Sequence, residues 1–131
     1  MEIVGVLEFL CGVLDLEGAE FGAHRLNRNK ERALGLFARG RGVGRVGTIG
    51  GEANRGYDAL RLVILVRWGR DGVRAEAKAR EIYEAVAGCG FEHGGKSGFL
   101  TAVNEGPVWV GVDERGVFEY TVDFDVYAAR N

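Results

Sequence analysis

Hydrophobic and polar positions are most clearly ordered between residues 58 and 86, where a buried strand leads directly into an amphipathic helix. The strand, residues 60–68, reads LRLVILVRW, with apolar side chains on one face and in the middle of the other. This pattern predicts a central strand of a sheet that is covered on both faces. The helix follows at once, with Asp71 as its expected N-cap and Gly88 as its C-terminal stop. Its apolar stripe contains Ala75, Ala79, Ile82, Tyr83 and Val86.

The remaining pattern predicts one more helix and four more strands. Residues 2–16 carry apolar side chains at helical spacing, and residues 33–39 form a short strand candidate. Strands are also expected at residues 99–104, 107–112 and 117–127, the last with the cleanest alternation. The polar positions of that last strand, expected to face outward, are Glu119, Thr121, Asp123 and Asp125.

These elements define an α+β fold in the order α-β-β-α-β-β-β. We expect a mixed, mostly antiparallel sheet with the two helices packed on it, in one domain spanning residues 1–131. Residues 17–29 and 89–97 are read as connections. Residues 40–56 form a long loop rich in Gly and Arg, which is predicted to extend from the sheet, for example as a β-hairpin arm.

Charge is distributed unevenly although the net charge is only −2. Residues 24–45 hold seven of the 17 Lys and Arg residues and one of the 19 acids, so they carry +6 and the remainder −8. The two cysteines, Cys11 and Cys89, are expected to be reduced, buried or boundary residues of a cytosolic protein. No apolar stretch reaches the roughly 18 residues of a membrane span, so no membrane association is expected.

Two glycine-rich motifs resemble nucleotide-binding loops but lack the required context. Residues 90–97, GFEHGGKS, match the phosphate-loop pattern, yet a helix precedes them and a predicted strand follows. Residues 42–47, GVGRVG, match the dinucleotide pattern, yet no helix pattern follows. Neither motif predicts a nucleotide site, and we expect no cofactor.

The titratable residues form no predicted catalytic or metal site. His24 and His93 are far apart in sequence and lack metal-ligand spacing to a cysteine or acid, so both are read as solvated loop residues. No nucleophile is paired with a base in any recognisable pattern. We therefore expect a protein that is not an enzyme.

The basic segment has two interpretations. Residues 25–45 could contact the phosphates of a nucleic acid as a small binding module, but Phe37 is the single aromatic residue among them, which disfavours single-strand stacking. Alternatively, the segment meets an acidic face on another subunit, a head-to-tail contact that can close into a ring. The residues predicted for this interface are Arg39, Arg41, Arg45, Arg55, Glu119, Asp123 and Asp125.

Residues 50–127 resemble a family of phage minor capsid proteins, the tail-terminator or head–tail completion proteins of long-tailed phages and prophages. The resemblance rests on Gly50-Gly51, on LRLVILVRW, and on the helix AEAKAREIYEAV with Ala79 and Tyr83. It rests above all on GPVWVGVDERGVFEYTVDFDVY, which contains Pro107, Gly111, Asp113, Glu114 and Gly116. Residues 40–56 are richer in Arg and Gly than the family pattern.

The resemblance implies a structural virion protein without chemistry or cofactor. It implies a self-assembled ring of about six subunits that caps the finished tail tube and docks it to the head. The implied partners are further copies of the chain, the tail-tube protein and a head-completion protein. The implied location is the virion, with assembly in the host cytoplasm.

Overall fold

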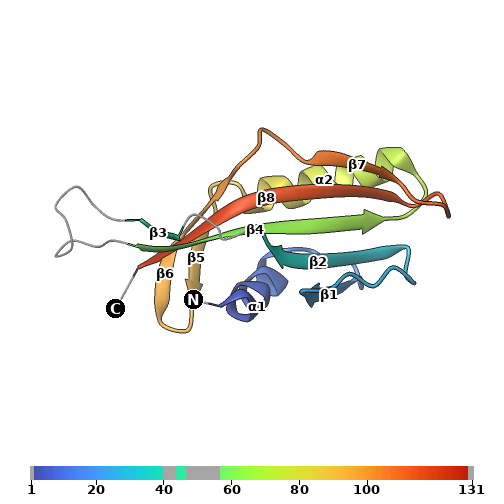
Figure 1. Ribbon diagram of the computed structural model, residues 1–131. Helices are drawn as coiled ribbons and strands as arrows, with labels where there is room; N and C mark the ends of the chain where they lie inside the picture. Colours follow the sequence, from blue (N-terminus) through green and yellow to red (C-terminus); the bar gives the residue numbers. More distant parts are fainter. Residues whose placement is uncertain (1, 40–43, 47–56, 130–131) are drawn as a thin grey trace.

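The computed structural model describes residues 2–39, 44–46 and 57–129, which form one curled sheet with two helices (Figure 1). In chain order the elements are α1 Ile3–Val13, β1 Glu20–Ala23, β2 Arg32–Ala38, β3 Gly44–Val46, β4 Tyr57–Trp68, α2 Gly72–Val86, β5 Gly90–His93, β6 Lys96–Ala102, β7 Val108–Val112 and β8 Phe118–Ala129. The predicted α+β class, with its two helices, is confirmed.

The sheet is built around two long antiparallel strands, β4 and β8, which pair from Tyr57↔Ala129 to Arg67↔Glu119. The strand order is β1-β2-β4-β8-β6-β5. The short strand β3 adds to β4 beyond the end of β2, and β7 adds to β8 beyond the end of β6. All of these pairs are antiparallel except β1 with β2, so the sheet is mixed and mostly antiparallel, as predicted.

The predicted order of elements was wrong because it omitted three short strands. The segment read as a connection at residues 17–29 contains β1, and the one at residues 89–97 contains β5 and the start of β6. The third, β3, lies in the predicted arm and pairs with the start of β4. The remainder of the arm, residues 40–43 and 47–56, lies outside the described residues.

The hydrophobic core lies between one face of the sheet and both helices. The two central strands alternate, and their even-numbered apolar side chains point toward the helices. Asp71 caps α2 as predicted, accepting hydrogen bonds from the N–H groups of Val73 and Arg74. Fully buried core residues include Val6, Leu10, Leu36, Leu62, Ile64, Val66, Ala79, Val86, Leu100, Val122, Phe124 and Val126. Among the described residues, neither helix is long and apolar enough to cross a membrane.

Candidate assembly surface

The sheet face that points away from the helices is charged. We call it the charged face; it consists of Arg61 and Arg67 on β4 and Glu119, Thr121, Asp123 and Asp125 on β8. The alternation of β8 predicted this orientation but not the burial. The outward face of this strand was expected to be wet or to meet a partner, and the three acids are only 5–9% exposed within the single chain.

Arginine side chains and a loop together cover the charged face. The loop after β1 crosses β2 so closely that a Cβ added at Gly35 would lie 2.6 Å from the backbone oxygen of Arg25. Only glycine permits this approach, because any side chain would collide with backbone atoms. The loop thereby lies over the end of the charged face that holds Arg67 and Glu119, to which its Arg28 and Lys30 are hydrogen-bonded.

Each acid of β8 is paired with an arginine of the same chain. Arg61 binds Asp125, its register partner, with two hydrogen bonds of 2.8 and 2.9 Å. Two further pairs join Arg39 to Asp123 at 3.5 Å and Arg28 to Glu119 at 2.5 Å. The side chains of Arg28 and Arg39 are each 57% exposed and that of Arg61 is 39% exposed. The buried acids therefore hold a row of partly exposed arginines, which we call the arginine row.

Arg67 differs from the arginine row because its side chain is fully buried. Its guanidinium donates to Glu119 at 3.0 Å and to Asp113 at 2.5 Å. It also donates to the backbone oxygens of Lys30 and Arg28. One side chain thus joins β4, β8, the β7–β8 turn and the loop that covers the charged face.

Asp113 is the most strongly perturbed acid of the site. Its carboxylate accepts hydrogen bonds from the Val117 N–H, the Arg67 guanidinium and the Arg115 N–H. These bonds lower the pKa of Asp113 from 3.8 to about 2, the Val117 bond contributing most. Ionised Asp113 therefore stabilises the fold above about pH 4, and this stabilisation is lost as the pH falls from about 4 to about 2.

Asp113→Asn is expected to flatten the acid side of the stability profile. The free energy of unfolding of the variant should fall less steeply than that of the wild type between about pH 4 and pH 2, because one carboxylate with a lowered pKa is gone. Urea unfolding across this pH range measures the slope. Glu114→Gln changes an exposed neighbour in the same turn and should keep the wild-type slope. Equal slopes for Asp113→Asn and the wild type would contradict the assignment.

The predicted interface residues are only partly brought together. Arg39, directly after β2, lies beside Asp123, and the three acids share one strand face. Arg41 and Arg55 lie outside the described residues, and only the backbone of Arg45 is described, within β3. Sequence reasoning missed the role of Arg61 and Arg67, which it treated only as charged positions near the ends of a strand. Both arginines occupy odd-numbered positions of β4, whereas its apolar stripe occupies even-numbered positions. This alternation was the signal that they lie on the polar face of the sheet, as the acids do.

Strand β7 exposes four apolar side chains at the edge of the sheet. Val108, Trp109, Val110 and Val112 are 44–60% exposed, Trp109 the most. Among the described residues β7 pairs with β8 alone, so its outer edge has no strand partner. Exposed edge strands of natural proteins usually carry charges that block pairing with another chain. We call this strand, with its free outer edge, the β7 edge.

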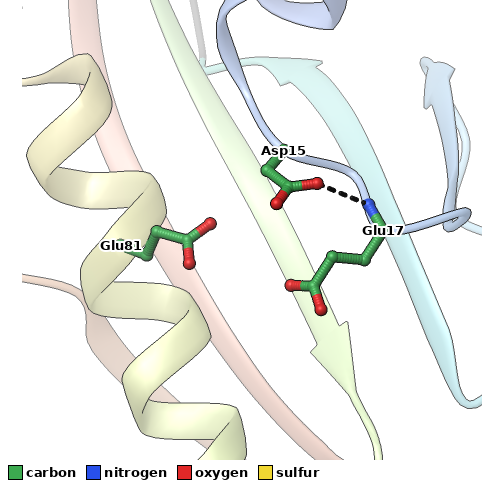
Figure 2. Close-up of side chains that lie close together, drawn as sticks. All are labelled: Asp15, Glu17 and Glu81. Atoms are coloured by element: carbon green, nitrogen blue, oxygen red, sulfur yellow. Dashed lines mark hydrogen bonds between the residues drawn. The ribbon is translucent and has the colours of Figure 1, made fainter.

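A separate acidic cluster surrounds a buried lysine in the middle of α2. Figure 2 shows Asp15 and Glu17 in the chain after α1, facing Glu81 on α2. The Lys78 side chain, 3% exposed, donates to Glu17 at 2.7 Å, to Glu81 at 2.8 Å and to the Asp15 backbone oxygen. Its ammonium also lies 4.9 Å from the centre of the Trp68 ring. The lysine ammonium therefore offsets part of the negative charge of this cluster by pairing with Glu17 and Glu81.

The phosphate-loop-like motif forms a β-hairpin. Gly94 and Gly95, with φ values of 60° and 80°, form the turn between β5 and β6. This left-handed backbone at both positions is typical of a two-residue hairpin turn, and the segment continues into β6 rather than into a helix. The motif therefore lacks the helix N-terminus on which phosphate binding depends.

Two expectations about single side chains were wrong. His93 is not a loop residue: it ends β5, and its Nε2 atom lies 3.1 Å from a carboxylate oxygen of Glu8 on α1. Cys11 is neither buried nor at a boundary, because it is exposed on α1, whereas Cys89 is half-buried. His24 is an exposed residue directly after β1, as predicted.

A sheet braced by ion pairs, with a row of held arginines and an apolar free edge, is typical of a structural protein that works by contacting other proteins. The family model described as "Bacteriophage tail terminator protein" matches residues 40–129, and the chain belongs to this family. The matched region contains both central strands, α2 and the β7 edge. The family resemblance stated from the sequence is thereby confirmed. No curated protein and no solved structure matches the chain.

Proposed function

We propose that the chain assembles into a ring of about six copies that caps the finished tail tube and joins the tail to the head. The observation that carries this proposal is membership of the tail terminator family across β3 to β8. Several copies are expected to share this role, because identical head-to-tail contacts can close into a ring around the end of a tube. The proposed location is the virion, with assembly in the host cytoplasm.

The arginine row is the proposed contact with a neighbouring virion protein. Glu119, Asp123 and Asp125 are too buried to reach a partner, but they hold Arg28, Arg39 and Arg61 at the surface. Arg41, Arg45 and Arg55 belong to the same proposed contact. Its partner carries an acidic surface, on another copy of the chain, the tail-tube protein or a head-completion protein. Since guanidinium groups bind carboxylates with two parallel hydrogen bonds, such a contact fixes orientation.

A role in nucleic-acid binding through residues 25–45 has less support. Phe37 is the single aromatic residue among residues 25–45, which disfavours stacking of nucleic-acid bases. The family model that matches residues 40–129 describes a bacteriophage tail terminator protein. The proposal therefore names protein partners.

The test is to count the protein in purified phage tails by quantitative mass spectrometry, with the tail-tube protein as the internal reference. We expect one ring, about six copies per tail, whatever the tail length. Deletion of the gene should give tails and heads that remain separate, and supplying the gene in trans should join them. Complete tailed particles that lack the protein would overturn the proposal.

A further inference from the structure

We infer that the β7 edge of one subunit pairs with the free edge of β1 in the next copy, so that one sheet continues across the subunit boundary. This inference rests on the proposed ring and names the surfaces that build it. It involves neither the arginine row nor the segment that lies outside the described residues.

The β7 edge has the properties of a strand that is completed by another chain. It offers an unpaired backbone edge and four apolar side chains, and it carries no charged residue between Val108 and Val112. Trp109, 60% exposed, is the residue type that most often dominates the energy of a protein–protein contact. Strand addition combines backbone hydrogen bonds, which supply affinity, with side-chain contacts, which supply specificity.

The complementary edge lies on the opposite side of the same sheet (Figure 1). Among the described residues β1 pairs with β2 alone. The His24 N–H donates to the Leu36 oxygen, so the alternation of the strand turns the N–H groups of Phe21 and Ala23 toward the free side. With four residues, β1 is nearly as long as β7, which has five.

The surroundings of β1 favour an apolar partner. Glu20, the acid of this strand, accepts a hydrogen bond from Asn27 of the same chain at 3.4 Å. Val13, at the end of α1 and 39% exposed, belongs to the helix that contacts β1. Of the other outer strands, β5 is a poorer partner because it carries the exposed Glu92 and ends at His93, which is paired with Glu8. Strand β3 has three residues and is shorter than β7.

Two different edges on opposite sides of one sheet define a head-to-tail contact. Each subunit then offers β7 to one neighbour and β1 to the other, and the copies close into a ring when the rotation between neighbours is a whole fraction of a full turn. Pairing of β7 with β7 would instead produce a two-fold dimer with no further growth. A contact of β7 with β1 is therefore compatible with a ring, whereas a contact of β7 with β7 is not.

Cysteine cross-linking tests the contact directly. In a Cys11→Ser, Cys89→Ser background, Val108→Cys or Val110→Cys protein is mixed with Phe21→Cys or Ala23→Cys protein, so that neighbouring registers are covered. The mixtures are oxidised both in assembled tails and as concentrated purified protein, and the disulfides are mapped by mass spectrometry. We expect disulfides between a β7 position and a β1 position in at least one mixture. Val73→Cys, which places a thiol on α2 at a still more exposed position, should form none with β1.

The results separate this inference from the proposed function. Tails that contain the protein but give no β7–β1 disulfide, or give mainly β7–β7 disulfides, would overturn the inference and leave the function standing. Absence of the protein from tails would overturn the function. In that case the cross-linking of purified protein tests the inference. Disulfides between β7 and β1 in the purified protein would support the contact, and their absence would contradict it.

A second variant measures the strength of the contact. Trp109→Lys is expected to enter tails roughly 30-fold less efficiently than wild-type protein in direct competition, because loss of a central aromatic residue has that effect on association. Val73→Lys, a charge at the most exposed apolar residue of α2, should compete equally with the wild type. Both side chains are exposed, so neither change should alter thermal stability. Equal incorporation of Trp109→Lys would overturn the inference.

Discussion

Arg67→Met is expected to lower the free energy of unfolding by about 3–5 kcal/mol, because it removes one partner of a buried ion-pair network. Glu119 would then keep its charge at 7% exposure with only Arg28 beside it. The backbone oxygens of Arg28 and Lys30 would lose their donor as well. Chemical unfolding monitored by circular dichroism measures the change.

Two further variants show whether the effect comes from uncompensated charge. Adding Glu119→Gln to Arg67→Met removes the buried charge and should recover part of the lost stability. Arg70→Met breaks the pair with Glu31, in which both side chains are more than half exposed, and should change stability by less than about 1 kcal/mol. If Arg67→Met cost no more than Arg70→Met, the network would not brace the sheet.

Gly98→Ala is expected to destabilise the protein by at least about 3 kcal/mol, because the added methyl group would overlap the backbone of β8. A Cβ at this position would lie 1.7 Å from the Tyr127 oxygen and 2.8 Å from the Ala128 Cα. Backbone atoms cannot rotate away as a side chain can, so β6 would have to separate from β8. Thermal and urea unfolding of the purified variant measure the loss.

The same hairpin supplies the matched control. Gly90→Ala changes a strand glycine on β5 that has no atom within 4 Å of an added Cβ. It should be neutral or stabilise the protein by up to about 1 kcal/mol, since alanine restricts the unfolded chain more than glycine. Equal effects of the two substitutions would show that the β6–β8 backbone approach is not what selects glycine.

Periodicity in the sequence was sufficient to predict the long elements. The strand around Ile64, the helix capped by Asp71 and the alternating strand around Phe124 each repeat their pattern over many residues. The missing strands β1 and β5 span four residues each, which is too short for a period to emerge. Strands β1 and β5 form because their backbones hydrogen-bond to β2 and β6. The residues of such a short strand do not reveal which strand it will pair with.

The sequence also predicted which side chains of β8 share a face, but not what covers them. Burial of Asp125 depends on Arg61, which is 64 positions away in the chain and directly opposite in the sheet. Burial of Glu119 involves the loop that crosses Gly35, whose Arg28 pairs with Glu119, and no periodicity reveals this contact. The candidate site was therefore predicted as three acids with the arginines of residues 39–55, whereas the roles of Arg61 and Arg67 required the register of the sheet.

The pairing of β4 with β8 also has a consequence for biosynthesis. The pairing of β4 with β8 can form only after residues 118–129 have been synthesised. Synthesis of α2 and three further strands comes between the two. A contact between such distant segments forms late and slowly. A nascent chain still held by the ribosome before residue 118 lacks the strand that supports β7, so it cannot present the β7 edge. Only a chain that includes β8 can therefore form the β7 edge.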